Sequence, residues 1–403
     1  MSNRDLFLTK EREAIIPSLL YADLYKFSML QFYTNRFPNV VAKYELKVRS
    51  DFEFAPFIDE INYQLDLVSK LRFTKEELDY LKTIRFLKPT FINQLRNFSL
   101  DRNYVHAYVD EDGKFQCYSE GPLGQASMFE IYVLAILQEI RSRVVLTDEN
   151  FETGKQILAT NIHDVNEYVK HKVFKYSDFS CRRAASVKWL DYVIFETTRN
   201  VASAYFTGTS CVYYAMKYNI KAIGTIAHEA ICLGQAIVHP FDSQEFIFEQ
   251  WNQEYHGDLG IALSDTFGVK YFIKKVFHRG FAMLFAGVRH DSGDPVKFGE
   301  DIIQMYKGYG IDPITKQIVF SDGLTFKKAF YLNDYFNGRI LTSYGIGTKN
   351  GNDLGVDALQ IVMKMVEADG KPVIKIADTS GKGMCKNVTY EHFMKEHVAK
   401  VVE

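Results

Sequence analysis

Short apolar runs that end in polar clusters recur through residues 174–350, and helical patterns follow them. The runs are rich in β-branched and aromatic residues, which favours strands, and the clusters recur at roughly the length of one strand–helix unit. Because parallel strands of a barrel present their carboxyl ends to the active site, we expect the clusters to meet at one rim. Polar loops follow strands in any α/β protein, but ordinary loops would not so consistently collect Arg, His, Asp and paired glycines. The runs occupy residues 174–176, 221–223, 260–263, 281–288, 317–320 and 339–342.

The regions that flank this repeat have a different pattern. The first hundred or so residues mix predicted helices with predicted strands, which indicates an α+β domain, and the last thirty or so predict a strand and a helix that pack back on it. A helical segment at residues 128–140 leads into the barrel. We therefore predict an N-terminal domain at residues 1–125, a barrel at 126–365 and a C-terminal segment at 366–403. The N-terminal elements are predicted helices at 23–36 and 75–81 and predicted strands at 41–48 and 104–109.

Composition points to small-molecule chemistry. The 403 residues are 47% hydrophobic and 15% aromatic, enough for one large core and a smaller one. Basic and acidic residues number 48 and 50 and are interspersed, so no block of charge suits nucleic acid or an anionic membrane.

The same features predict a cytoplasmic protein. The charged opening residues 1–13 lack the apolar core of a signal peptide, and apolar runs such as 281–288 are far shorter than a membrane helix. Five cysteines form no C-x-x-C pair, which is typical of free thiols in a reducing compartment. A structural zinc site is not expected.

Two of the polar clusters favour phosphate and ribose binding. Tyr344-Gly345-Ile346-Gly347-Thr348-Lys349 lacks the Walker lysine, but its glycines would let backbone N–H groups approach an oxyanion; the alternative is a tight turn. Arg289-His290-Asp291-Ser292-Gly293-Asp294-Pro295 combines a guanidinium that can clamp an anion with carboxylates that can accept from ribose hydroxyls or hold magnesium through water. Its alternative is a solvated loop of compensating charges.

A third cluster, Gly224-Thr225-Ile226-Ala227-His228-Glu229, offers an imidazole. It is not H-E-x-x-H, because Cys232 stands four positions after His228, and a lone histidine is more often structural than catalytic. An imidazole beside phosphate-binding loops is nevertheless a candidate nucleophile toward a phosphoryl group, with a carboxylate fixing its tautomer.

Two segments favour a flat anionic ring. Phe179-Ser180-Cys181-Arg182-Arg183 would let such a ring stack on the aromatic side chain and pair with a guanidinium; the alternative is an exposed basic turn. Ala22-Asp23-Leu24-Tyr25-Lys26 opens a predicted helix, where Asp23 would ordinarily be the cap.

Taken in order, these segments resemble the nicotinate phosphoribosyltransferase family from Tyr21 to Cys385. The most specific are G-V-R-H-D-S-G-D-P, which ends at Pro295, and G-T-I-A-H-E, which ends at Glu229. The chain departs from the family's F-G-T-R-R-x-F at Ser180, Cys181, Ala184 and Ala185, and from its usual Trp at Ala230. The further segments that carry the resemblance are residues 22–26, 44–49, 179–183, 208–210, 259–265, 320–323 and 344–349.

The resemblance implies a distorted α/β barrel, as in type II phosphoribosyltransferases, beside an N-terminal α/β sandwich domain completed by the C-terminal segment. It implies a homodimer with shared sites that makes nicotinate mononucleotide from nicotinate and 5-phosphoribosyl-1-pyrophosphate for NAD salvage. His228 matches the histidine that ATP phosphorylates, and Mg²⁺ would be carried in by the pyrophosphate group, with no metal site of the protein's own.

The resemblance also implies roles for individual residues. The pyridine ring would lie between Phe179 and the partner subunit's Tyr25, and Arg49 and Lys364 would reach the phosphates of the neighbouring subunit's ligands. The residues implied in catalysis are His228, Glu229, Arg289 and Asp291. Those implied in substrate binding are Tyr25, Phe179, Arg182, Ser210 and Asp265. Those implied in phosphate binding are Arg49, Asp322, Gly323, Gly347, Thr348 and Lys364.

Two other functions stay open. The related nicotinamide phosphoribosyltransferase has aspartate in its G-T-D, an acceptor for the amide N–H, whereas this chain has Ser210, whose hydroxyl can donate to a carboxylate. A barrel without catalytic activity that senses nucleotides is the second alternative, and the presence together of His228, Arg289, Asp291 and Thr348 argues against it.

Overall fold

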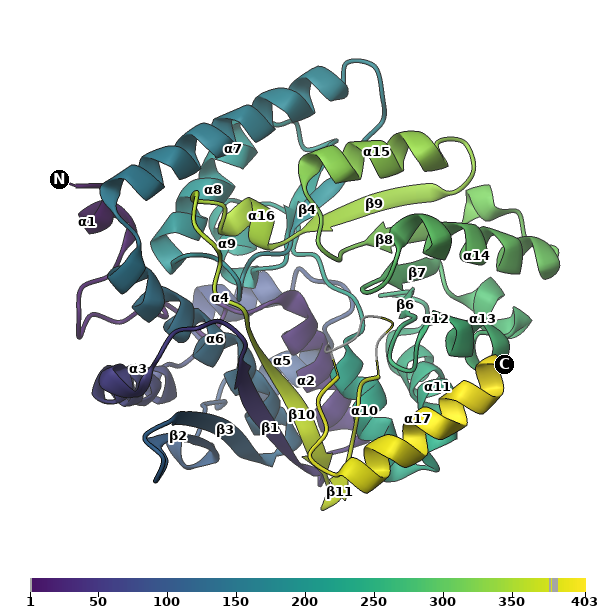
Figure 1. Ribbon diagram of the computed structural model, residues 1–403, viewed down its shortest axis with the longest axis horizontal. Helices are drawn as coiled ribbons and strands as arrows, with labels where there is room; N and C mark the ends of the chain where they lie inside the picture. The colour runs from purple at the N-terminus through teal and green to yellow at the C-terminus, as the bar shows by residue number, and fades with distance from the viewer. Residues whose placement is uncertain (1, 377, 379–382) are drawn as a thin grey trace.

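Two sheets organise the computed structural model, which describes residues 2–376, 378 and 383–403 (Figure 1). A five-stranded sheet has the order β11-β10-β1-β3-β2 with antiparallel neighbours, and a six-stranded sheet has the order β5-β4-β9-β8-β7-β6 with parallel neighbours. The antiparallel sheet lies at the lower left of Figure 1, and the parallel strands fan across the upper right.

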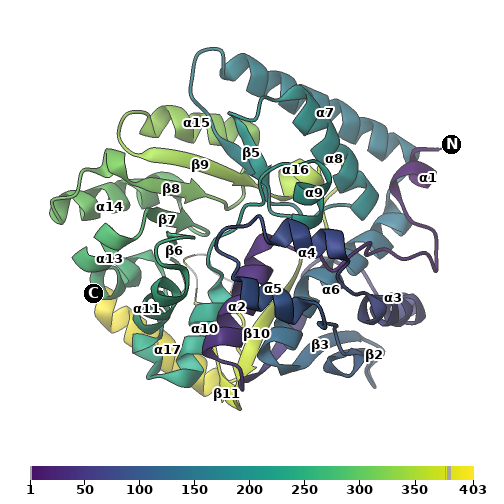
Figure 2. The ribbon, with the colours of Figure 1, turned by 180° about the vertical axis from the view of Figure 1, so that it is seen from behind.

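The antiparallel sheet packs against one long helix. α6 (Leu123–Val145) is apolar around most of its circumference and is almost wholly buried, because it lies against β1, β3 and β10 on one side and α2 and α3 on the other. Figure 2 shows α2, α4 and α5 covering this region from behind. The helices here are α1 (Asn3–Phe7), α2 (Leu24–Arg36), α3 (Ile58–Lys70), α4 (Lys75–Leu81) and α5 (Pro89–Leu95). The strands are β1 (Val41–Val48), β2 (Val105–Val109), β3 (Phe115–Pro122), β10 (Ile361–Ala368) and β11 (Lys371–Pro372).

The parallel sheet is that of a distorted barrel, with helices along its outside (Figures 1 and 2). A single parallel bridge between Thr209 and Ala222 extends it beyond β5. The strands are β4 (Tyr176–Asp178), β5 (Phe206–Thr209), β6 (Ile261–Leu263), β7 (Gly287–His290), β8 (Gln317–Phe320) and β9 (Leu341–Ile346). The helices are α7 (Asp148–Tyr168), α8 (Val187–Asn200), α9 (Val212–Lys217), α10 (His228–Ile237), α11 (Ser243–Tyr255), α12 (Val269–Tyr271), α13 (Arg279–Leu284), α14 (Pro295–Gly308), α15 (Phe326–Phe336) and α16 (Thr348–Gly351). The predicted fold class is confirmed.

Four predicted strands differ in extent, and the first of them, at 174–176, overlaps β4 only at Tyr176. The run at 281–288 divides between α13 and β7, because the side chain of His278 caps a helix that begins at Arg279. The run at 221–223 contributes only the bridge at Ala222. β9 continues to Ile346, so Gly345 lies inside a strand and not in the loop after it.

The C-terminal part of the chain contacts both regions. β10 pairs with β1 along its whole length, and therefore crosses the predicted boundary at residue 365. α17 (Val388–Val402) instead contacts α12 and the π-helical turn Phe272–Val276. Its Phe393 also stacks on Phe241. The last helix thus contacts the barrel side, while Lys386 just before it pairs with Glu45 of β1; the domain assignment stays a prediction.

Within the described residues, no helix has both the length and the apolar character needed to cross a membrane.

Candidate active site

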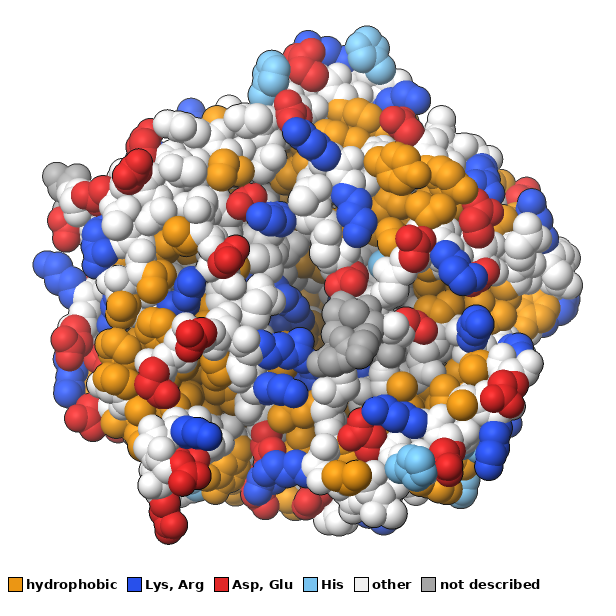
Figure 3. Space-filling view, in the orientation of Figure 1, with side chains coloured by type: hydrophobic (Ala, Val, Ile, Leu, Met, Phe, Trp, Pro, Cys, Tyr) orange, Lys and Arg blue, Asp and Glu red, His pale blue; other side chains and the backbone are white. Residues whose placement is uncertain are grey.

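One cavity of about 550 Å³ lies between the carboxyl ends of the parallel strands and the wall formed by β1, β10 and α6. In Figure 3 a hollow near the middle of the molecule is flanked by Lys and Arg side chains. Every predicted site residue except Asp265 lines this cavity. The lining residues include Tyr25, Arg49, Phe179, Arg182, Ser210, His228, Glu229, Arg289, Asp291, Asp322, Gly323, Gly347, Thr348 and Lys364. Their roles in binding or catalysis stay predictions.

The strand register explains why residues so far apart meet. His290, the last residue of β7, pairs with Phe320, the last residue of β8, and Phe320 pairs in turn with Tyr344 of β9. The loops that carry Asp291, Asp322 and Gly347 therefore leave the sheet at one edge.

Aromatic rings, guanidiniums and a hydroxyl form one part of the cavity wall. Phe179 follows β4, and Tyr25 lies in the first turn of α2. The guanidinium carbon of Arg182 lies 5.6 Å from the centroid of the Tyr25 ring, and that of Arg289 lies 6.0 Å from the Phe179 ring. The Oγ atom of Ser210 is buried and has no hydrogen-bond partner among the described residues, which leaves it available to a ligand.

Two carboxylates that sequence reasoning did not select hold Arg182. Asp23 makes no cap hydrogen bond to α2; its Oδ2 atom instead lies 2.9 Å from an Arg182 nitrogen. Glu130 of α6 lies 3.9 Å from Arg182 and lines the cavity. Asp23 lies in the segment 22–26 that carries the family resemblance, so the sequence could have indicated it. Glu130 lies in the helical segment 128–140, which shows no pattern that points to a site.

Glu229 faces away from His228. Its carboxylate accepts from the Lys26 ammonium at 2.7 Å, the Tyr44 hydroxyl at 2.9 Å and the Ser127 hydroxyl at 3.0 Å. Burial alone would lower the pKa of Lys26, but Glu130 and Glu229 together raise it above its usual value. Glu229 thus belongs to a buried ion-pair network beside α2, and other carboxylates orient the imidazole.

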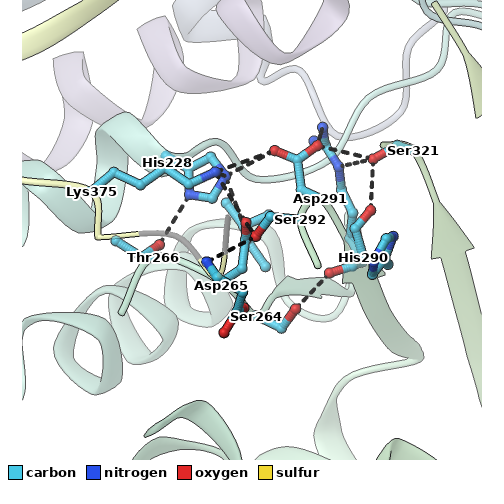
Figure 4. A network of polar contacts seen from close by, with 12 residues as sticks. His228, Ser264, Asp265, Thr266, His290, Asp291, Ser292, Ser321 and Lys375 are labelled. Carbon is cyan, nitrogen blue, oxygen red and sulfur yellow. Dashed lines mark hydrogen bonds and ion pairs between the residues drawn. The ribbon is translucent and has the colours of Figure 1, made fainter. Parts of the chain in front are cut away.

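Those carboxylates are Asp291 and Asp265 (Figure 4). The Nε2 atom of His228 lies 3.1 Å from Asp291 Oδ2 and 3.3 Å from Asp265 Oδ1, while Nδ1 lies 3.1 Å from the Thr266 hydroxyl. Asp265 is fully buried behind the imidazole and accepts from Ser292, so its position supports a contact with His228 and not with substrate. Lys375 completes the group, with Nζ 2.7 Å from Nε2.

The charges of this cluster depend on one another. Burial, and then the ammonium of Lys375, lower the pKa of His228, which favours a neutral imidazole. Burial alone would raise the pKa of Asp291, but Arg289 and Lys375 hold it well below its usual value. The pKa of Asp265 is likewise lowered by His228 and Lys375 against the effect of burial. A neutral imidazole with a free lone pair is the form that can attack phosphorus.

His228, Asp265 and Asp291 offer ligand atoms within 4.8 Å of one another, the spacing of a metal site. The Lys375 ammonium, however, lies 3.1 Å from Asp265 and 3.5 Å from Asp291. It already supplies the positive charge that a cation would bring, and an imidazole is a poor ligand for Mg²⁺. The cluster therefore does not fit a resident Mg²⁺ ion.

Arg289 is held on all three of its nitrogens. Nε donates to Ser321 at 2.8 Å, and the two terminal nitrogens donate to Thr225 at 3.0 Å and to Asp291 at 2.8 Å. The guanidinium is thus fixed in orientation next to Phe179 before any ligand binds. Thr225 lay in a predicted cluster, but its contact with Arg289 was not predicted.

Basic side chains line the wall that β10 contributes. Burial, and then the positive charges of Lys375 and Arg49, lower the pKa of Lys364 to about 8. Such a group of cations favours ligands with several negative charges, such as phosphates. Gly323 has a φ of +55° at the turn after β8, and Thr348 begins the short helix α16 after Gly347.

The positions where the sequence departs from the family pattern lie outside the cavity lining. Ser180, Cys181, Ala184, Ala185 and Ala230 are all buried. The hydroxyl of Ser180 instead bonds to Asp178, a buried carboxylate that also accepts from Thr209 and Asn350.

The contribution of a partner subunit to the site, which the resemblance implies, stays a prediction. The pyridine ring was expected between Phe179 and the partner subunit's Tyr25, with Arg49 and Lys364 reaching across to a neighbouring site. Here the chain's own Tyr25, Arg49 and Lys364 line the same cavity as Phe179, because β1 and β10 place the N-terminal sheet directly over the strand ends.

Sequence comparisons agree with this architecture over nearly the whole chain. The model of the nicotinate phosphoribosyltransferase family matches residues 174–400, and the model of its N-terminal domain matches residues 20–138. The nicotinate phosphoribosyltransferase of Acinetobacter baumannii is 41% identical over 392 residues, which cover 95% of this chain and 96% of that protein. That of Xylella fastidiosa is 40% identical over 95% of this chain and 98% of its own.

Solved structures give the same result. The nicotinate phosphoribosyltransferase of Vibrio cholerae superposes with a TM-score of 0.91 at 33% identity and covers 99% of this chain and 96% of its own. That of Porphyromonas gingivalis superposes with a TM-score of 0.90 at 29% identity, over 96% of this chain and 100% of its own. The chain therefore belongs to the nicotinate phosphoribosyltransferase family.

Proposed function

We propose that this protein transfers the 5-phosphoribosyl group of 5-phosphoribosyl-1-pyrophosphate to nicotinate, and so forms nicotinate mononucleotide and pyrophosphate for NAD salvage. The bond from ribose C1 to pyrophosphate breaks, and the pyridine nitrogen forms the new bond to C1. The observation that carries the proposal is that one cavity combines aromatic rings and an unpartnered hydroxyl with basic side chains and strand-end loops. Such a site works by positioning two ligands and stabilising charge, with no protein nucleophile at the sugar.

The ring of nicotinate would lie between Phe179 and Tyr25, with Arg182 and Arg289 nearby. The buried Ser210 hydroxyl, which has no partner in the described part of the chain, would donate to the carboxylate of nicotinate. A hydroxyl can also accept from an amide, so nicotinamide is the rival substrate, but the neighbouring guanidiniums favour the anion.

At the sugar and phosphates, Asp291 would accept from the ribose hydroxyls, and Asp322, Gly323, Gly347 and Thr348 would surround the 5-phosphate. Arg49 and Lys364 would face the pyrophosphate group. Mg²⁺ would enter bound to these phosphates and neutralise part of their charge, and the carboxylates that line the cavity can accept hydrogen bonds from its water ligands.

We further propose that ATP phosphorylates His228, so that each turnover also releases ADP and phosphate. The lowered pKa of His228 and its position on the cavity wall support this role. The resemblance also implies a homodimer, and a cytoplasmic location suits an enzyme that uses these substrates. Because one chain supplies Tyr25, Arg49 and Phe179 to one cavity, we propose that each subunit carries a complete site.

A product assay tests the substrate. The purified protein is given 5-phosphoribosyl-1-pyrophosphate, Mg²⁺ and either nicotinate or nicotinamide, each with and without ATP. We expect nicotinate mononucleotide to form rapidly with ATP and slowly without it, and little product from nicotinamide. Comparable turnover of the two bases would reject the assignment of nicotinate. No product from either would favour a nucleotide-sensing barrel without catalytic activity.

A further inference from the structure

Lys375 contacts the imidazole of His228, although it lies in none of the segments that the sequence pattern selected. It lies between β11 and α17, and its side chain is 7% exposed and lines the cavity. Its Nζ atom lies 2.7 Å from His228 Nε2, 3.1 Å from Asp265 Oδ2 and 3.5 Å from Asp291 Oδ2 (Figure 4). A single ammonium thus contacts the imidazole and both carboxylates beside it.

The backbone around Lys375 is anchored to the elements that hold His228. Gln235 of α10 donates to the carbonyl of Ile374 at 2.7 Å and accepts from its N–H at 2.9 Å. The N–H of Ile376 donates to the carbonyl of Thr266 at 2.8 Å. α10 begins at His228, and Thr266 contacts the Nδ1 atom of His228. The same two elements therefore position the Lys375 ammonium and the His228 imidazole. The ordering of the lysine side chain is therefore built into the fold.

The two ring nitrogens of His228 have different surroundings. Nδ1 faces the hydroxyl of Thr266, which is fully buried, whereas Nε2 faces Lys375 and Asp291, which line the cavity. An ammonium can only donate, so Nε2 accepts from Lys375, and the proton of the neutral ring then lies on Nδ1. A ligand in the cavity consequently meets the lone pair of Nε2.

The carboxylates make this lone pair difficult to approach. The oxygens of Asp291 and Asp265 lie 3.1 Å and 3.3 Å from Nε2, and both would repel a phosphoryl group. Lys375 contacts both of them and offsets that repulsion. We propose that Lys375 is a catalytic residue of the phosphohistidine step, which first holds the Nε2 lone pair toward the cavity and then pairs with the transferred phosphoryl group. The inference rests on the proposed function, because it requires ATP to phosphorylate His228.

The step balances with the groups present. The Nε2 lone pair forms the bond to the γ-phosphorus of ATP, the bond from that phosphorus to the bridging oxygen breaks, and its electron pair leaves with ADP. The Nδ1 proton stays on the ring beside Thr266. Lys375 keeps its protons and moves its hydrogen bond from Nε2 to a phosphoryl oxygen. In hydrolysis, water attacks phosphorus, the N–P electron pair returns to Nε2, and dihydrogen phosphate leaves with the oxygen and both protons of the water.

Single-turnover labelling with γ-labelled ATP tests the proposal. In Lys375→Met, which removes the charge at similar volume, we expect acid-labile labelling of the protein to slow by about 100-fold, the loss typical of one electrostatic contact to the reacting group. ATP-independent formation of nicotinate mononucleotide should fall much less than labelling, because that reaction does not pass through the phosphohistidine. Lys375→Arg should label at an intermediate rate, because it keeps the charge with a different shape.

Lys371 provides the matched control. It lies on β11, near Lys375 in the same stretch, and its ammonium donates to the carbonyl of Ala236 outside the cavity. Lys371→Met should label like the unaltered protein, and His228→Ala should not label. Labelling of Lys375→Met at the unaltered rate would overturn the inference and leave the proposed function standing. Equal loss of ATP-independent transfer in a folded Lys375→Met would also overturn it. No label on the unaltered protein would instead reject the proposed ATP coupling itself.

Discussion

The ring of Phe179 occupies the space that the missing side chain of Gly345 leaves open: a β carbon at Gly345 would lie 2.4 Å from the Cδ2 atom of that ring. The two residues lie beside each other because β4 and β9 pair in parallel, with Ser177 opposite Gly345. The N–H of Phe179 also donates to the carbonyl of Ile346 at 2.8 Å. The first glycine of the G-x-G pattern thus places an aromatic wall of the cavity.

Gly345→Ala is therefore expected to displace the Phe179 ring. The added methyl group would clash with atoms of the ring, and the Phe179 backbone is held by β9, so the ring has to turn away. We expect the KM for nicotinate to rise by about tenfold, equivalent to about 1.4 kcal/mol of lost stacking. The KM for 5-phosphoribosyl-1-pyrophosphate should change much less. Steady-state kinetics with each substrate varied in turn measures both.

Gly308→Ala is the control for this prediction, because Gly308 ends α14 and a β carbon there would have no neighbour within 4 Å. It should leave both KM values unchanged. An unaltered KM for nicotinate in Gly345→Ala would show that the Phe179 ring does not contact the base.

The general position of the site was predictable from the sequence, because the polar clusters follow short buried strands and neighbouring strands pair in register. Arg289 and Asp291 at the end of β7 and Asp322 at the end of β8 meet for this reason. The G-x-G pattern was less informative. A glycine next to a ring and a glycine next to a phosphate look alike in a sequence, and only the register of β9 against β4 distinguishes them.

The detailed geometry around His228 was not predictable. Glu229 is adjacent in sequence, but the helical path of α10 directs its carboxylate to Lys26, and Asp291 and Asp265 take the place beside the imidazole. Lys375 contacts His228 from 147 residues further along the chain and stands in no distinctive pattern. Long-range contacts of this kind arise because the backbone at Ile374, next to Lys375, is bonded to Gln235 of α10, which local sequence does not specify.

Ser210 is predicted to set the choice of base. Ser210→Ala removes the one hydroxyl proposed to donate to the nicotinate carboxylate, and hydrogen bonds to charged groups contribute about 1.5–3 kcal/mol. We therefore expect kcat/KM for nicotinate to fall by roughly 10- to 150-fold. Ser210→Asp should repel nicotinate more strongly and gain relative activity toward nicotinamide. If both variants keep the original ratio of kcat/KM values, Ser210 does not contact the carboxyl group.

The lowered pKa of Lys364 predicts that the binding of 5-phosphoribosyl-1-pyrophosphate depends on pH. Its pKa of about 8 lies below the usual lysine value, so the free protein loses this positive charge as the pH rises through 8. Because bound phosphates favour the charged form, affinity for 5-phosphoribosyl-1-pyrophosphate should fall by roughly tenfold between pH 7 and pH 9. Binding titrations across this range should show the fall in the unaltered protein and a flatter profile in Lys364→Met. The same slope in both proteins would assign the titration to another group.

Mixing two variants that lack ATP-coupled activity tests whether each chain carries a complete site. Tyr25→Ala and His228→Ala are purified separately, mixed and allowed to exchange subunits. If sites were shared across a homodimer, mixed dimers would contain one intact site and regain ATP-coupled activity. Because Tyr25 and His228 of one chain line one cavity, we expect no recovery. With equal amounts mixed, recovery toward about a quarter of the unaltered activity would show that Tyr25 acts in the partner's site.

The most direct test of the central claim, that one cavity carries both ribosyl transfer and phosphorylation of His228, is the ratio of ADP to nicotinate mononucleotide formed by the unaltered protein and by His228→Ala. With nicotinate, ATP and 5-phosphoribosyl-1-pyrophosphate present, we predict that the unaltered protein forms ADP with each mononucleotide. His228→Ala should still form the mononucleotide slowly, without any ADP. ADP formation by His228→Ala at the unaltered rate would contradict the account.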